Sequence, residues 1–194
     1  MQTITKVYAS YDRARSAVSD LESAGIPMAD ISVLANESAR EDATLHVENE
    51  TEAGAGAGVG AVVGGAAGLL TGLGLMAIPG LGPVVAAGWL ASTALGVVAG
   101  GATGGIVGSL INAGVSEDDA HVYSEAVRRG GTLLSVNTQD HNVATVHSIL
   151  DKYSPFDPAE RGAAYRNDGW NKFDPEGGAY GFVNSNDDRG RPSL

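Results

Sequence analysis

The chain has 194 residues, no cysteine and a formal net charge of −11, with lysine at only three positions. The lack of cysteine excludes disulfides, thiolate metal sites and thiol nucleophiles. Nucleic-acid binders need a basic surface that displaces counterions from phosphates, and anionic lipids attract basic segments. We therefore expect no nucleic-acid partner, and a lipid bilayer as partner only through hydrophobic contact.

Residues 1–52 predict the first part of an α+β domain. Alternating β-prone residues indicate strands, and apolar residues at helical spacing indicate a helix. Ser10 is suited to cap this helix, and Gly25 followed by Pro27 ends it. The expected elements are strands over 3–9, 30–35 and 43–47 and a helix over 11–24.

The most unusual feature is the run from Ala53 to Ser116, 64 residues without Asp, Glu, Lys, Arg or His. Within it, small residues recur at every fourth position in two series. Small residues at this spacing form a flat helical stripe on which another backbone can pack closely. The predicted helix-packing positions are Gly56, Gly60, Gly64, Gly68 and Gly72 in the first series and Gly88, Ser92, Gly96, Gly100, Gly104 and Gly108 in the second.

Turn-forming residues separate the two series: Pro79, Gly80, Gly82 and Pro83. Because proline and glycine do not continue a helix comfortably, we predict a glycine-zipper helical hairpin over 53–115, with arms over 57–78 and 84–112. As helices the arms would be about 33 Å and about 43 Å long. Each arm exceeds the roughly 20 residues that cross the hydrocarbon core of a bilayer.

A stripe repeated every four residues rotates by about 40° per step around a helix of 3.6 residues per turn. One straight partner cannot cover such a stripe along its length, so we predict a homo-oligomer. Three surroundings stay open for the segment: a membrane-inserted hairpin, the shared core of a soluble oligomer, and a flexible linker. The acidic flanks lack the Lys or Arg that orients membrane proteins, and the Leu, Val and Ile content is high for a solvated linker.

Residues 116–153 predict the second part of the α+β domain. Ser116 followed by three acids is a good helix start, and Arg128 and Arg129 before Gly130 form a good helix end. Without the inserted hairpin, the order is that of a ferredoxin-like βαββαβ sandwich, with one sheet and helices on one face. The expected elements are a helix over 117–129, a strand over 132–136 and a helix over 141–153.

Residues 154–194 form a tail rich in Gly, Asn and Asp, with aromatic residues spaced along it. One interpretation is a solvated tail with a few anchors, and the other is an arm whose rings dock on a neighbouring subunit. The candidate tail anchors are Phe156, Tyr165, Trp170, Phe173 and Tyr180.

The sequence carries no recognisable catalytic pattern. Its glycines complete neither G-x-G-x-x-G nor a phosphate loop, and no serine lies in G-x-S-x-G. The four histidines are scattered, and the acids of the tail lack the spacing of a calcium loop. We therefore predict no enzyme, no cofactor and no metal site.

Two stretches carry a resemblance to a known family. The first is Val7-Tyr8-Ala9-Ser10 through Gly25-Ile26-Pro27 into Asp30-Ile31-Ser32-Val33, and it resembles the N-terminal half of the bacterial general-stress-protein (heat-induced, YflT-type) domain family. The second is similar to glycine-zipper members of that group and comprises Ala77-Ile78-Pro79-Gly80-Leu81-Gly82-Pro83 and Arg128-Arg129-Gly130-Gly131. The resemblance spans residues 3–152 and implies a stress-associated, non-enzymatic bacterial protein without catalytic residues to assign.

Together these features predict a stress-associated protein that self-assembles through the helical hairpin at or in a membrane. The alternative is a soluble homo-oligomer, a shell or filament subunit, that buries the hairpins between protomers. A ligand-binding sensor domain is the third hypothesis. The expected location is the cytoplasm, with association with the inner membrane left open.

Overall fold

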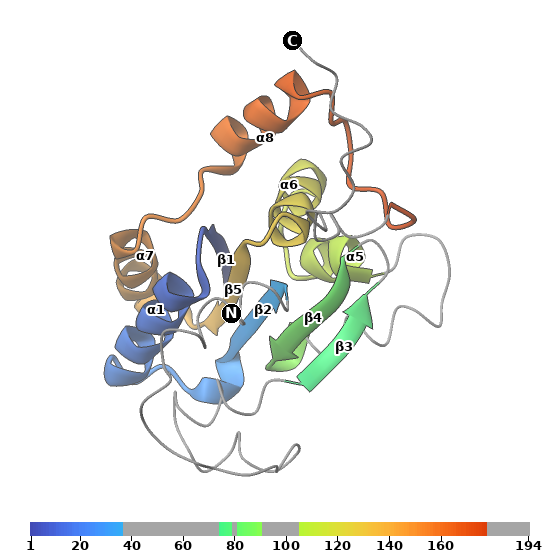
Figure 1. Cartoon of the computed structure of the whole chain (residues 1–194). Helices are drawn as coiled ribbons and strands as arrows, with labels where there is room; N and C mark the ends of the chain where they lie inside the picture. Colours follow the sequence, from blue (N-terminus) through green and yellow to red (C-terminus); the bar gives the residue numbers. More distant parts are fainter. Residues whose placement is uncertain (37–73, 79–80, 91–104, 178–194) are drawn as a thin grey trace.

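A five-stranded antiparallel sheet is the centre of the fold. The computed structural model describes residues 1–36, 74–78, 81–90 and 105–177 of the chain (Figure 1). Neighbouring strands are all antiparallel, in the order β1-β5-β2-β4-β3. The strands are β1 (Gln2–Tyr8), β2 (Ile31–Asn36), β3 (Gly74–Ile78), β4 (Gly82–Ala87) and β5 (Thr132–Thr138).

Helices cover both faces of this sheet, so the described part of the chain has three layers. Figure 1 shows α1 and α7 on one side and α5 and α6 on the other, with α8 next to α6. The helices are α1 (Tyr11–Ser23), α5 (Gly105–Asn112), α6 (Glu117–Arg128), α7 (Val143–Lys152) and α8 (Pro158–Asn167), with short 3-10 turns η1 (Met28–Asp30) and η3 (Asp140–Asn142).

Each strand contributes alternate residues to two hydrophobic cores, as the two-residue repeat of a strand requires. On β5, Leu134 and Val136 pack under α1 and α7, whereas Leu133 packs under α6. On β2, Val33 and Leu34 divide in the same way. Both strands are buried on both faces, which is why their apolar runs are nearly continuous rather than alternating.

Most elements outside the charge-free segment form where the sequence predicts them. Ser116 caps α6 by accepting a hydrogen bond from the Asp119 backbone N–H at 3.2 Å. At the other end, Gly130 has φ +96°, and the Gly130 and Gly131 amides donate to the carbonyls of Val127 and Ala126. This is a Schellman motif, which satisfies the last carbonyls of the helix.

The predicted helical hairpin is wrong where the structure describes it. Residues 74–78 and 82–87 are antiparallel strands in which Ile78 pairs with Gly82, and the predicted turn residues Pro79 and Gly80 between them lie outside the described residues. Of the second predicted arm, the described residues form β4 up to Ala87 and are helical at Trp89 and Leu90 and again in α5. The reason is tertiary: β4 pairs with the open edge of β2, and that pairing satisfies backbone groups which the glycine-rich sequence holds poorly in a helix.

The mixed α/β class is confirmed, but the specific ferredoxin-like arrangement is not. Two of the five strands come from the charge-free segment, β5 lies between β1 and β2, and helices cover both faces instead of one. The two-sided burial of β2 and β5 explains the second helical layer. The predicted strand over 43–47 lies outside the described residues.

Gly88, predicted as a helix-packing position, instead turns the chain directly after β4. Its φ is +86°, and a Cβ there would lie against the Ile31 carbonyl oxygen and 2.7 Å from Cα of Ser32. The buried Ser32 hydroxyl fixes the same turn, because it donates to the Ala87 carbonyl at 2.8 Å and accepts from the Leu90 amide at 3.2 Å. The absence of a side chain at Gly88 therefore permits close contact with β2 inside the domain.

Among the described helices, none is long and apolar enough to cross a membrane.

Candidate functional site

The aromatic residues of the tail pack on α6 of their own chain. Asp157 caps α8 by accepting from the Glu160 amide at 2.9 Å, and Pro158 occupies the first turn, where its missing N–H costs nothing. Tyr165, Trp170 and Phe173 are each at least 92% buried in the core beneath α6. Tyr165 and Trp170 meet edge to face with ring centroids 5.7 Å apart, a favoured aromatic geometry.

The remaining tail anchors lie at the ends of this docked region. Phe156 is partly buried against the same core, and its backbone N–H donates to the Val7 carbonyl at the outer edge of β1 at 2.7 Å. Tyr180 lies outside the described residues. Residues 154–177 are thus fixed to the domain, and the sequence did not predict the α8 helix that fixes them.

A fully buried carboxylate lies near the C-terminal end of α6. Oε1 of Glu125 accepts from Nε of Arg129 at 2.7 Å, and Oε2 lies 2.6 Å from Nη2 of Arg128. Glu125 is 0% exposed and the Arg128 side chain only 8%, so water screens this cluster poorly. Three ionised groups are thus held in one arrangement under the tail.

Guanidinium groups in this region lie over aromatic rings. The central carbon of the Arg129 guanidinium is 4.3 Å from the Tyr165 ring centroid, and that of Arg161 is 3.9 Å from the Phe156 centroid. Arg128 lies over Phe173 at 5.5 Å. Such cation–π contacts stabilise by about 0.5–1 kcal/mol each at exposed sites. The contacts of Arg128 and Arg129 join the tail to the end of α6, whereas that of Arg161 lies within the tail.

A cavity of about 280 Å³ opens between these groups, at the end of β1, the end of α6 and the inner side of α8. The space stays open because several of its lining residues are alanine or glycine, and two arginines and two aromatic residues also line it. Its lining comprises Ala9, Ala126, Arg129, Gly130, Gly131, Phe156, Arg161, Ala164, Tyr165 and Asp168.

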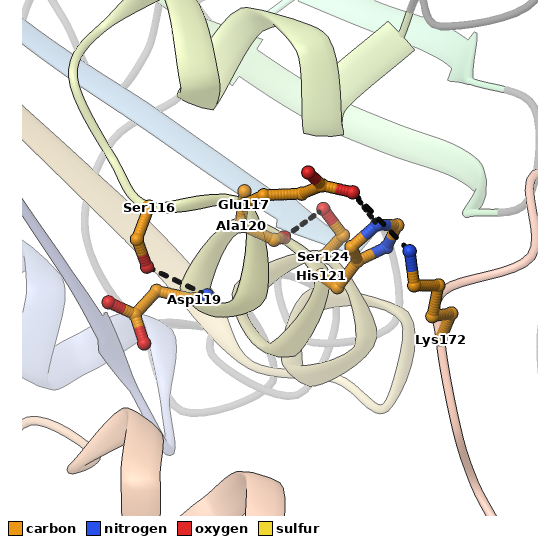
Figure 2. A network of polar contacts seen from close by, with 7 residues as sticks. All are labelled: Ser116, Glu117, Asp119, Ala120, His121, Ser124 and Lys172. Carbon is orange, nitrogen blue, oxygen red and sulfur yellow. Dashed lines mark hydrogen bonds and ion pairs between the residues drawn. The ribbon is translucent and has the colours of Figure 1, made fainter.

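A second polar cluster lies on the first turns of α6 (Figure 2). Nζ of Lys172, from the tail, donates to Oε1 of Glu117 at 3.3 Å. Nε2 of His121 lies 3.9 Å from the same oxygen, and Nδ1 of His121 is buried without a hydrogen-bond partner among the described residues. The cluster connects the tail to α6 near solvent, and its imidazole is 15% exposed.

Burial lowers the pKa of His121 below its ordinary value of 6.5, and the nearby Lys172 lowers it further, against smaller opposing effects of Glu117 and Asp118. The unfolded chain therefore takes up the proton first as the pH falls. We expect full stability above pH 6.5 and a loss of stability as the pH falls from 6.5 through the lowered folded pKa.

Urea unfolding measured between about pH 7.5 and pH 5 tests this expectation. His121→Leu should flatten the dependence of the free energy of unfolding on pH in this window. His141→Gln, at an exposed position, should leave it unchanged. An equal slope in the His121→Leu protein and the original chain would contradict the assignment.

Most predicted helix-packing positions, from Gly56 to Gly72 and from Ser92 to Gly104, lie outside the described residues. Gly88 and Gly108 are described: the first turns the chain after β4, and the second lies in α5, which packs with α6. Of the predicted turn residues, Gly82 and Pro83 begin β4. The described residues contain no group of three metal-ligating side chains.

Sequence reasoning missed Glu125 and Arg161. The spacing of Glu125 to Arg128 and Arg129 is that of ordinary surface ion pairs on a helix, and only the docked tail makes it a buried cluster. The sequence does contain a signal for the α8 helix, because Asp157-Pro158 is a typical helix start and Gly169 follows the helix end.

Comparison with known families gives one finding. Residues 3–80 match the family model described as the heat-induced stress protein YflT domain. The resemblance to this family is confirmed over that range, which contains α1, β2 and β3 and all of β1 except Gln2. The family description names a stress response and no catalysed reaction. Neither the curated proteins nor the solved structures compared with this chain give a match.

Proposed function

We propose, from the heat-induced stress protein domain that residues 3–80 match, that this chain is a non-enzymatic, stress-associated protein that assembles with further copies of itself. The charge-free segment, residues 53–116, is the assembling part. The small α+β domain carries this segment and fixes its middle in the sheet.

The observation that carries the proposal is the position of β3 at the edge of the sheet. Within the described residues, β3 pairs only with β4, and its five residues, Gly74–Ile78, include no charged residue. Proteins usually protect such edges with charges, prolines or a covering segment, because an unprotected edge pairs with another chain. The two edges of this sheet differ in that respect.

The other edge, β1, is protected in these ways. It contains Lys6, which forms an ion pair with Asp151 at 3.0 Å. The Val7 carbonyl accepts from the Phe156 amide, and the Thr5 carbonyl lies 3.4 Å from the Tyr123 hydroxyl that donates to it. An assembly edge at β3 and a closed edge at β1 favour a limited oligomer over an open-ended one.

Protein copies, rather than lipid, are the proposed surroundings of the segment. Its middle strand, β4, is covered on both faces by the domain, with Val84 and Val85 fully buried in different cores. A strand in the middle of the segment that pairs with β2 does not fit a bilayer-spanning helical hairpin. The glycine series on either side of β3 and β4 are the second proposed contact between copies.

A charged residue placed in β3 tests the proposal. Ala77→Lys should reduce the mass of the particle in solution, because a charge on an edge strand opposes pairing. Thr145→Lys places the same charge on the exposed side of α7 and should leave the mass unchanged. Size-exclusion chromatography with light scattering gives the mass, and circular dichroism checks that both variants are folded.

Gly64→Leu and Gly100→Leu test the glycine series independently of the sheet. Each should weaken the oligomer if close helix packing contributes to it. An unchanged mass in both glycine variants and in Ala77→Lys would refute self-assembly through the charge-free segment. Recovery of the chain only with vesicles or detergent would instead favour lipid as its surroundings.

A further inference from the structure

We propose that the cavity between α6 and α8 binds a small organic oxyanion, a phosphate ester or a carboxylate, through the guanidinium group of Arg161. This site goes beyond the proposed assembly function and does not depend on it. Three observations support the inference: the cavity itself, the lack of an ion pair at Arg161, and the size and lining of the cavity.

Arg161 is the cationic group of the cavity that has no opposite charge of its own. Among the described residues, no carboxylate forms an ion pair with it, and its guanidinium stacks on Phe156 at 3.9 Å. Stacking occupies the face of a guanidinium and leaves its N–H edge for an acceptor. In a chain of net charge −11, a half-buried, unpaired guanidinium is unusual.

Of the other charged groups of the region, Arg129, Asp168 and Asp157 have partners, whereas the exposed carboxylate of Glu160, which lines the adjoining cavity, has no ion pair among the described residues. Arg129 pairs with the buried Glu125, and its Nη1 lies 4.0 Å from a carboxylate oxygen of Asp168, which is 69% exposed. In the adjoining cavity of about 270 Å³, Asp157 is engaged as the N-cap of α8. The charge of Arg129 is thus compensated by Glu125 and Asp168, and Arg161 supplies the donors that have no described acceptor.

The shape of the cavity selects a small ligand. Its volume of about 280 Å³ lies just below the range of about 300–1,000 Å³ that is usual for ligand sites, and it is too small for a dinucleotide. The rings of Phe156 and Tyr165 flank the space and suit a small apolar or aromatic group. The inferred ligand therefore has one oxyanion and one compact apolar part, as a planar guanidinium recognises phosphate and carboxylate oxygens in pairs.

Calorimetric titration of the full chain tests the site. The probes are phenyl phosphate, benzoate and inorganic phosphate, which distinguish a phosphate ligand from a carboxylate ligand. Arg161→Gln should weaken binding of the preferred probe about tenfold or more, since a charge-assisted hydrogen bond is lost. Arg166→Gln removes the same charge from an exposed position on α8 and should change the affinity less than about twofold.

A second pair of variants tests the cavity without changing charge. Ala164 lines both cavities, so Ala164→Leu should abolish binding by filling them, whereas Ala163→Leu on the same helix should not. Saturable binding lost in Arg161→Gln and Ala164→Leu, and kept in both controls, supports the site. No saturable binding of any probe at millimolar concentration, or equal losses in a variant and its control, overturns it. None of these outcomes depends on the oligomeric state.

Discussion

Glu125→Ala is expected to lower the free energy of unfolding by about 3–5 kcal/mol, a large part of the roughly 5–15 kcal/mol that stabilises a typical domain. The substitution leaves the guanidinium of Arg128, of which 8% is exposed, without its carboxylate at 2.6 Å. Burying an unpaired charge costs far more than an exposed ion pair contributes. Urea unfolding at one protein concentration measures the change.

Two controls separate the buried cluster from helix charge in general. Asp118→Ala removes an exposed carboxylate from the same helix and should cost less than about 1 kcal/mol. Combining Glu125→Met with Arg128→Met should recover much of the loss, because an apolar pair replaces an ionic one and Arg129 can still reach Asp168. A loss below about 1 kcal/mol for Glu125→Ala would show that the carboxylate is not buried as described.

Gly88→Ala is expected to destabilise the domain by more than about 2 kcal/mol. Alanine is strained at φ +86°, and its Cβ would overlap the backbone of β2 at Ile31 and Ser32, which a strand paired on both sides cannot move away from. Thermal or urea unfolding gives the change in stability.

Gly130→Ala is the matched control for this position. Gly130 also has a positive φ, +96°, but a Cβ there would meet nothing within 4 Å. Its substitution should cost only the conformational penalty of about 1 kcal/mol. Similar losses at the two glycines would mean that the close approach of Gly88 to β2 is absent. In that case Gly88 would return to the set of helix-packing candidates.

Much of the described domain could be predicted because its signals are local. Ser116 and the Gly130-Gly131 pair define α6 from neighbouring residues, and β1 and β5 have β-prone sequences next to clear helix ends. The residues that cap a helix can be recognised in the sequence, because their hydrogen bonds join positions only a few residues apart in one stretch of chain.

The strands β3 and β4 could not be predicted in this way, because their partner is distant. Val84–Ala87 pairs with residues 33–36, and the Ser32 hydroxyl stabilises the turn after β4 by donating to the Ala87 carbonyl. The spacing of a glycine series is the same whether its glycines pack helices together or, as at Gly88, allow one backbone to approach another. The periodicity alone does not distinguish these uses.

The arginine-lined cavity was hidden for a similar reason. Arg129 and Arg161 are separated by 31 residues of intervening sequence, and only the packing of α8 on α6 brings them to one cavity. The contact between the two helices is close: a Cβ on Gly162 would lie 3.0 Å from a methyl group of Val122. Nothing in the local sequence of either helix specifies that contact.

Light scattering of the full chain without detergent, over a dilution series, tests self-assembly most directly. The account predicts a discrete particle whose mass is a multiple of the 19.6 kDa chain, reduced in Ala77→Lys and kept in Thr145→Lys. A folded chain that has the mass of a single copy at every concentration would contradict it.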